Sequence, residues 1–177
     1  PERDAVAHRL ATHASDVARS WAVQWVQFAG LPLAPRLQAV RRFAADPHFG
    51  VREFAWMAVR DAVVADADAA VLALVPWTAD ADENIRRFAS ELTRPRGVWC
   101  APIPALQREP WRALPLLESL RADGSRYVQN SVANWLNDAS KGQGPWVQAL
   151  GARWLAESDT PATRYIVRRA LRTLSKP

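Results

Sequence analysis

The chain has 177 residues, 49% of them hydrophobic, and its 23 basic and 18 acidic residues give a formal net charge of +5. This length and composition suit one domain, residues 1–177, with a continuous core. One cysteine, Cys100, excludes an intramolecular disulfide and indicates a reducing, cytoplasmic compartment. No apolar run is long enough to span a membrane, and the histidines lack metal-ligand spacing, so neither metal nor cofactor is expected. Because the chain begins at Pro1 rather than Met, we expect part of the N-terminus to be missing.

Apolar residues recur at helical spacing along the chain, and strand-like alternation is absent. One stretch interrupts the pattern: Pro95, Pro102 and Pro104 cannot continue a helix, so the segment that contains Trp99 is predicted to be a loop. The helices are predicted at residues 3–13, 16–29, 34–45, 48–63, 67–76, 83–94, 110–121, 125–140, 144–157 and 161–174.

A short pattern recurs along the chain: an aspartate, four further residues, and a branched aliphatic residue that opens a basic helix. It occurs at residues 46–51, 80–85 and 123–128, at intervals of 34 and 43 residues, with a looser copy at 159–166. Repeats of this length are typical of stacked helical-repeat solenoids, in which an outer helix, a turn and an inner helix form each unit. We therefore expect an all-α, right-handed α-solenoid of HEAT-like repeats, with inner helices at 48–63, 83–94, 125–140 and 161–174.

Basic residues are concentrated in the predicted inner helices and their ends. The spans 48–62, 83–96, 124–141 and 160–176 hold 13 of the 23 basic residues and five of the 18 acidic residues. This segregation predicts a basic concave face that contacts the phosphates of DNA, although pairs such as Arg87 and Glu91 are also typical of ordinary helix surfaces. The 13 basic residues are Arg52, Arg60, Arg86, Arg87, Arg94, Arg96, Arg126, Lys141, Arg164, Arg168, Arg169, Arg172 and Lys176.

Three acids within this basic face are candidates for function. Glu91 lies near the end of its predicted helix, where a negative charge opposes the helix dipole, although an ion pair with Arg87 or Arg94 is an alternative explanation. Glu53 lies in the first turn of its predicted helix, where the helix dipole favours an acid, so by itself it is interpreted as a structural residue. Asp138 belongs to a polar stripe that we expect opposite the buried stripe of Val128, Val132, Trp135, Leu136 and Ala139; the polar stripe comprises Asn130, Asn134, Asn137, Asp138 and Lys141.

The nine tryptophans divide into two groups. Trp99 follows Arg94-Pro95-Arg96 in the predicted loop, outside any helical pattern, and is therefore a candidate for the site. The other eight lie within helical patterns and are predicted to be core or half-buried: Trp21, Trp25, Trp56, Trp77, Trp111, Trp135, Trp146 and Trp154.

Three segments, residues 51–56, 90–99 and 131–141, resemble the HEAT-like-repeat alkylpurine DNA glycosylases, and among these the AlkC-type branch rather than the related AlkD type. The resemblance implies a monofunctional glycosylase that hydrolyses the N-glycosidic bond of cationic N-alkylated bases, such as 3-methyladenine, in duplex DNA and leaves an abasic site. Double-stranded DNA containing alkylated bases would be its partner. A monomer without an obligate protein partner, in the bacterial cytoplasm and associated with the nucleoid, is expected.

The same resemblance implies the residues of the site. Glu53, Glu91 and Asp138 match the family's active-site carboxylates, and Trp99 matches its active-site aromatic residue. Our hypothesis is that Glu91 and Asp138 flank the sugar of the lesion, assisted by Glu53. The residues predicted to bind DNA are Arg94, Arg96, Arg126, Asn134, Lys141, Arg164 and Arg168.

The expected chemistry is consistent with these residue types. A cationic alkylated purine is a good leaving group without a general acid, and its departure leaves positive charge on the deoxyribose. Carboxylates stabilise that charge and orient an attacking water, and an aromatic face adds to the stabilisation. A lyase would need an amine nucleophile, for which Lys141 and Lys176 are poorly placed.

Two other functions remain open from the sequence. A non-catalytic DNA-binding scaffold for damaged or branched DNA would bind tightly whether or not Glu91 is replaced by Gln. A protein-interaction adaptor would present an apolar or acidic concave face and bind its partner independently of salt, which the segregation of charge argues against.

Overall fold

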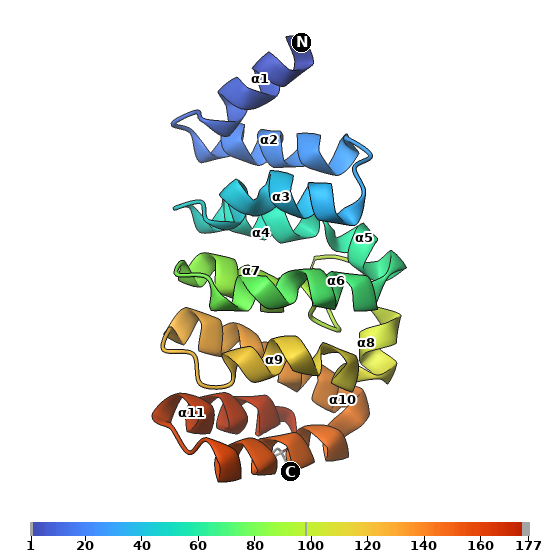
Figure 1. Cartoon of the computed structure of the whole chain (residues 1–177), viewed down its shortest axis with the longest axis vertical. Coiled ribbons are helices and arrows are strands. Elements are labelled where there is room, and N and C mark those ends of the chain that lie inside the picture. Colours follow the sequence, from blue (N-terminus) through green and yellow to red (C-terminus); the bar gives the residue numbers. More distant parts are fainter. Residues whose placement is uncertain (1, 98, 175–177) are drawn as a thin grey trace.

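The computed structural model describes residues 2–97 and 99–174, and the helices in this part of the chain stack into a column with α1 and α11 at opposite ends (Figure 1). Helices, turns and loops account for these residues, with no strand among them. The expected all-α helical-repeat fold is therefore confirmed. None of the helices described is long and apolar enough to cross a membrane.

The α-helices are, in chain order, α1 (Glu2–Ala11), α2 (Asp16–Phe28), α3 (Leu33–Ala44), α4 (Phe49–Met57), α5 (Arg60–Ala65), α6 (Ala67–Leu74), α7 (Glu83–Leu92), α8 (Pro104–Arg108), α9 (Leu114–Leu120), α10 (Arg126–Glu157) and α11 (Pro161–Ala170). Short 3-10 helices follow or precede three of these: η1 (Val75–Ala79), η2 (Pro110–Ala113) and η3 (Leu171–Thr173).

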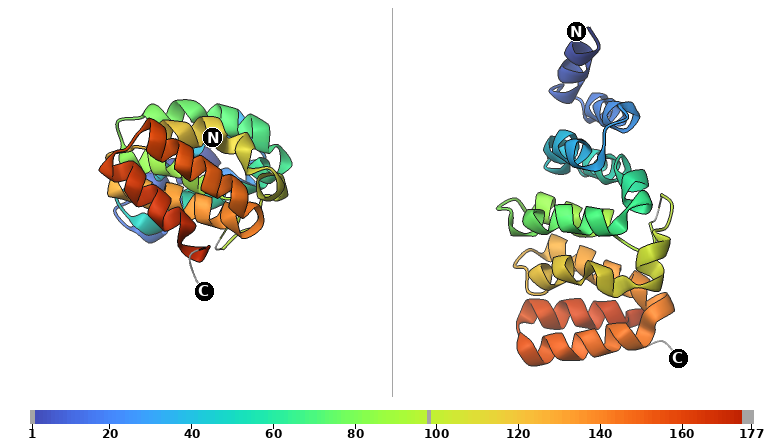
Figure 2. Two further views of the ribbon diagram at one scale, coloured as in Figure 1. Left: turned by 90° about the horizontal axis from the view of Figure 1, so that it is seen from below. Right: turned by 45° about the vertical axis from the view of Figure 1, so that its right-hand side comes forward.

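Successive helices pair into tiers, which Figure 2 shows one above another. The tiers are α1 with α2, α3 with α4, α6 with α7, α9 with the first part of α10, and the second part of α10 with α11. The second helix of each tier contacts its counterpart in the next: α4 packs on α7, α7 on α10, and α10 on α11. We call α2, α4, α7, the first part of α10, and α11 the inner row.

The repeated aspartate joins neighbouring tiers. The carboxylates of Asp46, Asp80 and Asp123 each accept a hydrogen bond, 2.8–2.9 Å long, from the backbone N–H two residues further on. Each carboxylate also forms an ion pair with an arginine of the preceding tier; these partners are, in order, Arg19, Arg41 and Arg86. Each aspartate thus stabilises its own turn by a hydrogen bond and links that turn to the preceding tier by an ion pair. These two roles explain why the residue recurs.

The predicted helix boundaries need four corrections. Residues 48–63 form two helices, α4 and α5, and the break between them lets Arg60 turn into the interior, where it is 3% exposed. Predicted helices 125–140 and 144–157 are one element, α10, which is kinked at Gln143; Pro145 lacks the N–H that would continue the hydrogen-bond ladder. Residues 110–121 divide into η2 and α9, and the short helix α8 was not predicted.

Burial of the tryptophans follows the prediction only in part. Trp56, Trp77, Trp135 and Trp154 are buried, but Trp21 is 65% exposed. Trp25 and Trp111 are exposed as well. Helical spacing shows that apolar residues share one face of a helix, but it does not show whether another helix covers that face.

Candidate active site

A cavity of about 260 Å³ opens between α4, α7 and α10 beneath the loop that follows α7. Its lining brings together three of the four predicted catalytic residues, Glu53, Glu91 and Trp99. Two larger hollows, of about 540 and 570 Å³, lie beside α2 but are lined mainly by apolar and aromatic side chains. The residues that line the smaller cavity are Glu53, Arg87, Glu91, Arg94, Trp99, Tyr127, Asn130, Ser131 and Asn134.

Glu91 lies in the last turn of α7 and is 5% exposed, with both carboxylate oxygens engaged. Its Oε1 accepts from Arg94 Nη1 at 2.6 Å, and its Oε2 accepts from Ser131 Oγ at 2.7 Å. Arg87 Nη2 lies 3.6 Å from the same Oε2. Burial by itself raises the pKa of Glu91, but the charges of Arg87 and Arg94 and these hydrogen bonds outweigh it and lower the pKa. Glu91 is therefore a buried anion at neutral pH.

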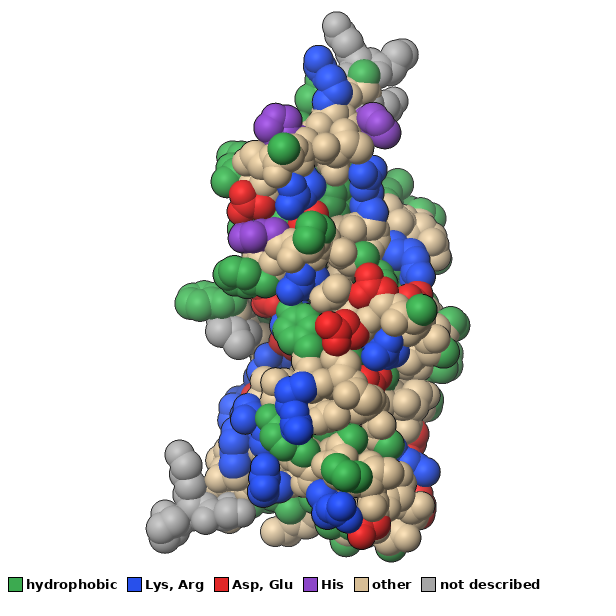
Figure 3. Space-filling view, turned by 90° about the vertical axis from the view of Figure 1, so that its left-hand side faces the viewer, with side chains coloured by type: hydrophobic (Ala, Val, Ile, Leu, Met, Phe, Trp, Pro, Cys, Tyr) green, Lys and Arg blue, Asp and Glu red, His purple; other side chains and the backbone are tan. Residues whose placement is uncertain are grey.

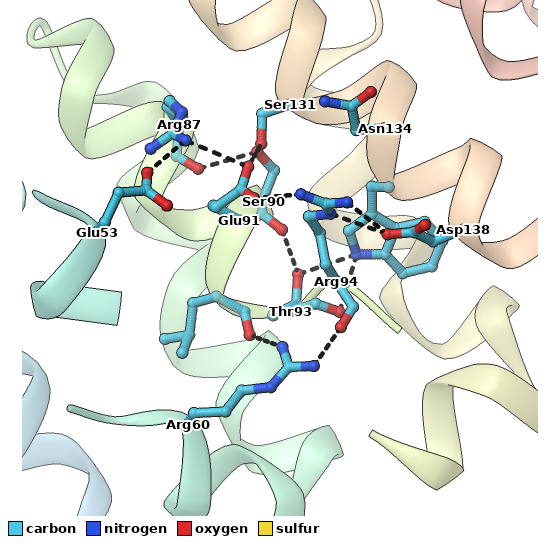
Figure 4. Close-up of polar contacts among 12 residues, drawn as sticks. Glu53, Arg60, Arg87, Ser90, Glu91, Thr93, Arg94, Ser131, Asn134 and Asp138 are labelled. Carbon is cyan, nitrogen blue, oxygen red and sulfur yellow. Dashed lines mark hydrogen bonds and ion pairs between the residues drawn. The ribbon is translucent and has the colours of Figure 1, made fainter. Parts of the chain in front are cut away.

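Glu53 is the more accessible acid of the cavity. Its side chain, on α4, is 30% exposed, and its Oε1 accepts from Arg87 Nη2 at 2.8 Å. The other oxygen, Oε2, accepts no hydrogen bond from the residues described here. The ring of Tyr127 lies against the Arg87 guanidinium, 4.4 Å away. Arg87 thus connects Glu53 and Glu91 (Figure 4), a role that the sequence showed only as an i,i+4 pair.

Asp138 lies near these acids but does not line the cavity. It is 6% exposed, and its Oδ2 accepts from Arg94 Nε at 3.0 Å and Nη2 at 2.7 Å. Its Oδ1 accepts from Lys141 Nζ at 3.0 Å. Figure 4 shows the Arg94 guanidinium between Glu91 and Asp138. The structure therefore brings Asp138 to the far side of Arg94, rather than opposite Glu91 across open space.

Arg94 is enclosed by the two carboxylates that it bridges. Its side chain is 13% exposed. Burial alone lowers the pKa of a guanidinium, but Glu91 and Asp138 outweigh that effect, and the pKa of Arg94 is raised. The Arg94 guanidinium is thus occupied by these two acids. Arg96, two residues later, is exposed and available to a phosphate.

Arg60 fixes the loop that carries Trp99. Its guanidinium donates to the carbonyl oxygens of Leu92 at 2.6 Å, Arg94 at 2.6 Å and Ala101 at 3.0 Å. The bonds to Leu92 and Arg94 satisfy carbonyls at the C-terminal end of α7 and place positive charge where the helix dipole favours it. The prediction that Arg60 belongs to the basic face is wrong, because this side chain is internal.

Trp99 lies at the rim of the cavity with 79% of its surface exposed. It follows α7 in the proline-rich loop and is the most exposed of the aromatic residues at this site. An exposed indole beside two carboxylates offers a face on which a base or sugar can rest.

Three of the predicted DNA-binding residues surround Tyr165. Arg126 lies 3.5 Å from the centre of the Tyr165 ring and Arg168 lies 5.6 Å from it. Together with Arg164 they line a shallow hollow of about 440 Å³ between α10 and α11, and all three arginines are exposed. The Tyr165 hydroxyl donates to Asn130 Oδ1 at 2.7 Å. On the face drawn in Figure 3, the largest group of basic side chains lies toward the C-terminal end of the stack.

Counting charges along the sequence overestimated the free basic surface. Arg86 pairs with Asp123, and Arg52 donates to the backbone carbonyl of Asp46 at 2.6 Å, so both hold turns together. Lys176 lies outside the described residues. On α10 and α11, Arg164 pairs with Asp159 at 2.7 Å, whereas Arg126 and Arg168 form no ion pair within the described residues. The basic charge that is free to meet a polyanion therefore lies mainly around Tyr165.

One member of the predicted polar stripe also faces elsewhere. Asn137 is buried, and its Nδ2 donates to the carbonyl oxygen of Ala170 at 2.9 Å and to Thr173 Oγ1 at 2.8 Å. Because an inner-row helix is contacted by the tiers on both sides, the side of α10 opposite its apolar stripe is only partly open. Asn134, by contrast, lines the cavity.

Comparison with known proteins identifies relatives that share this helical-repeat fold. No family model matches the chain. The uncharacterized protein YhaZ of Bacillus subtilis is 36% identical over 139 residues, which cover 78% of this chain and 38% of that protein. The structure of the alkylpurine DNA glycosylase AlkC of Pseudomonas fluorescens, bound to DNA containing an abasic-site analog, superposes with a TM-score of 0.78 at 30% identity, covering 95% of this chain and 45% of that one.

AlkD2 from Streptococcus mutans shares the fold, with a TM-score of 0.78 at 21% identity over 96% of this chain and 80% of that one. The stacked tiers, with two carboxylates and their arginines in one cavity, define a HEAT-repeat protein with a charged site on its inner row. The chain belongs to the AlkC/AlkD-like family of HEAT-repeat proteins, as its motifs indicated. It spans less than half the length of YhaZ and of AlkC.

Proposed function

We propose that this chain is a monofunctional DNA repair glycosylase. It hydrolyses the N-glycosidic bond of cationic N-alkylated bases of the 3-methyladenine type in duplex DNA and leaves an abasic site. One observation carries the proposal: Glu53 and Glu91 line the same cavity, with Trp99 at its rim. The structural similarity to AlkC supports the same activity.

Glu91 acts as a fixed anion in this proposal. Departure of the alkylated base leaves positive charge on the deoxyribose, and a preorganised negative charge close to the sugar stabilises that state. Both oxygens of Glu91 already accept hydrogen bonds, so this residue is better suited to electrostatic stabilisation than to taking a proton.

Glu53 orients the attacking water. Its Oε1 is held by Arg87, while its Oε2 accepts no hydrogen bond within the described part of the chain. A water bound to Oε2 attacks the anomeric carbon, its oxygen forms the new bond, and its proton passes to Glu53 and on to solvent. The base leaves with the electron pair of the glycosidic bond and becomes neutral. The proposal thus exchanges the roles that the sequence suggested for Glu53 and Asp138.

The DNA is held by two groups of residues. Arg126, Arg164 and Arg168 are exposed on α10 and α11 and are suited to contact backbone phosphates away from the lesion. Arg96, in the loop after α7, is suited to contact a backbone phosphate beside the lesion. We further propose that the protein acts as a monomer on alkylated duplex DNA, without an obligate protein partner, in the bacterial cytoplasm and associated with the nucleoid.

The proposal is tested by the products formed from an oligonucleotide duplex that carries one cationic N-methylated base. Chromatography should detect the free base, and mild alkali should then cleave the strand at the resulting abasic site. Borohydride should trap no protein–DNA adduct, because hydrolysis by water forms no Schiff base. An intact duplex after long incubation with excess protein would contradict the proposal.

One observation favours the alternative of a non-catalytic scaffold that binds damaged or branched DNA. Both oxygens of Glu91 and both oxygens of Asp138 are occupied by protein partners, an arrangement that a purely structural ion-pair network also produces. Salt-sensitive binding to the same duplex without release of the base would support this alternative.

A further inference from the structure

Two buried serines connect α7 and α10 directly behind Glu91. Ser131 Oγ lies 2.7 Å from Glu91 Oε2 and 2.7 Å from Ser90 Oγ. Ser90 is completely buried and Ser131 is 2% exposed. Both residues lie in the segments with family resemblance, yet the reaction described above gives neither of them a role.

The direction of this hydrogen-bond chain follows from its chemistry. Glu91 is an anion and only accepts, so Ser131 must give its single hydroxyl proton to Glu91. The Ser131 oxygen is then free to accept from Ser90, which shares its single hydroxyl proton between Ser131 Oγ and the Arg87 carbonyl oxygen, 3.0 Å away. The hydrogen-bond chain therefore ends on the Glu91 carboxylate, and the Ser131 hydroxyl is the donor to its Oε2.

We propose that Ser131, with Ser90 behind it, is a positioning residue that holds Glu91 in place and keeps Arg87 available to Glu53. The inference rests on the proposed glycosylase function. Arg87 Nη2 lies 2.8 Å from Glu53 Oε1 and 3.6 Å from Glu91 Oε2. Without the Ser131 hydroxyl, Glu91 Oε2 keeps no hydrogen-bond donor among the described residues, and Arg87 Nη2 lies 3.6 Å from it. Glu91 then competes with Glu53 for that guanidinium, and both carboxylates lose their alignment.

A pH profile separates this role from simple packing. The hydrogen bond from Ser131 lowers the pKa of Glu91, so its removal raises that pKa and moves the acidic limb of the rate profile to higher pH. A Ser131 variant leaves every neighbouring charge in place. The charged and titratable groups that face or adjoin Glu91 are Arg87 and Arg94 on α7, Glu53 on α4, Arg60 on α5, Asp138 and Lys141 on α10, and Cys100 in the loop.

The test compares Ser131→Ala, Ser131→Thr and Ser90→Ala in single-turnover release of a cationic methylated base. Ser131→Ala should slow release by about thirtyfold, as expected for losing a hydrogen bond to a charged group. It should also shift the acidic limb upward and leave affinity for an uncleavable duplex within about twofold of wild type. Ser131→Thr, which keeps the hydroxyl, should restore most of the rate.

Two comparisons sharpen the test. Ser90→Ala should slow release less, and the double variant should be no slower than Ser131→Ala, because Ser90 acts only through Ser131. Ser140→Ala provides the control, since Ser140 is a buried serine on the same helix that donates to the Asn137 carbonyl at 2.9 Å, outside the cavity. Its rate should equal that of the wild type.

Two results would overturn the positioning role while the glycosylase function stands. One is a Ser131→Ala protein with the wild-type rate and pH profile. The other is a slower protein whose acidic limb does not move and whose rate Thr does not restore, which indicates packing alone. A wild-type protein that releases no base overturns the proposed function before any substitution is made. Carbon-13 NMR titration of Glu91 in wild type and Ser131→Ala would then still decide whether the serine holds the carboxylate.

Discussion

Arg94 and Asp138 form an ion pair, 2.7 Å between Nη2 and Oδ2, that joins the end of α7 to the middle of α10. Their side chains are 13% and 7% exposed, so the pair is nearly sealed from solvent. Because Arg94 also holds Glu91, the pair fixes the position of this buried anion. This favours a supporting role for Arg94 and Asp138 over direct contact with a phosphate or the sugar.

Replacing Arg94 with Met should therefore destabilise the protein strongly. The substitution keeps most of the side-chain volume but leaves Glu91 and Asp138 buried without their shared partner, which typically costs about 3–5 kcal/mol. Urea unfolding measures the free energy. Arg153→Met is the control: its guanidinium is 44% exposed and pairs with Glu118, so its loss should cost less than about 1 kcal/mol. Similar losses in both variants would contradict the buried network.

Arg60→Ala should loosen the loop that carries Trp99. Three carbonyl oxygens lose their donor, which should destabilise the protein by roughly 3 kcal/mol and expose the segment between α7 and α8 to protease. Limited proteolysis with mapping of the cut sites measures the second effect. Base release should also slow, because Trp99 loses its position at the cavity. A variant with an unchanged cleavage pattern would show that the loop is held by other contacts.

Stability should fall in acid partly through Asp46. Burial raises the pKa of this carboxyl, but the hydrogen bonds from Arg19 and the His48 backbone outweigh it, and the pKa is lowered in the folded state. A depressed folded-state pKa stabilises the protein above the ordinary pKa of about 4, and that contribution is lost as the pH falls through the folded value.

Asp46→Asn removes this contribution. Relative to wild type, the variant should be less stable at pH 7, and the difference should shrink as the pH falls below about 4. Urea midpoints between pH 7 and pH 3 provide the measurement. Asp68→Asn, at an exposed acid on α6, should shift the curve little. Parallel wild-type and Asp46→Asn curves across this range would mean that Asp46 does not contribute through its charge.

DNA affinity should depend on the arginines around Tyr165. Arg126→Ala and Arg168→Ala should each weaken binding at any sequence and reduce the slope of log affinity against log salt by about one. Release at saturating DNA should change little, because these residues lie away from the cavity. Arg153→Ala, which removes an exposed arginine from the second part of α10, should leave the slope unchanged. Unchanged slopes in all three variants would contradict this location for the DNA backbone.

The sequence predicted most of what depends on local periodicity. The aliphatic residue after each repeated aspartate, such as Val51 or Ile85, is buried as expected. The aspartates lie at the turns because side-chain acceptors stabilise such turns locally. The family resemblance, rather than any spacing rule, predicted that one site contains Glu53, Glu91 and Trp99. These residues lie on different elements, which sequence spacing does not connect.

What the sequence could not predict depends on contacts between tiers. Arg60 and Arg87 look alike in a charge count, yet one caps α7 from the interior and the other links two acids at the cavity. Asp138 lies on the expected helix, but its partner, Arg94, belongs to the previous tier. Exposure of Trp21 likewise depends on whether a neighbouring helix covers that side of α2.

The most direct test of the central claim is single-turnover release of a cationic methylated base by wild type and Glu91→Gln. The substitution preserves shape and removes the buried anion, so the rate should fall by about a hundredfold or more, about 2.7 kcal/mol of barrier. Glu83→Gln, at an exposed acid in the first turn of the same helix, should retain the wild-type rate. Equal rates for wild type and Glu91→Gln would contradict the claim that this carboxylate stabilises the reacting sugar.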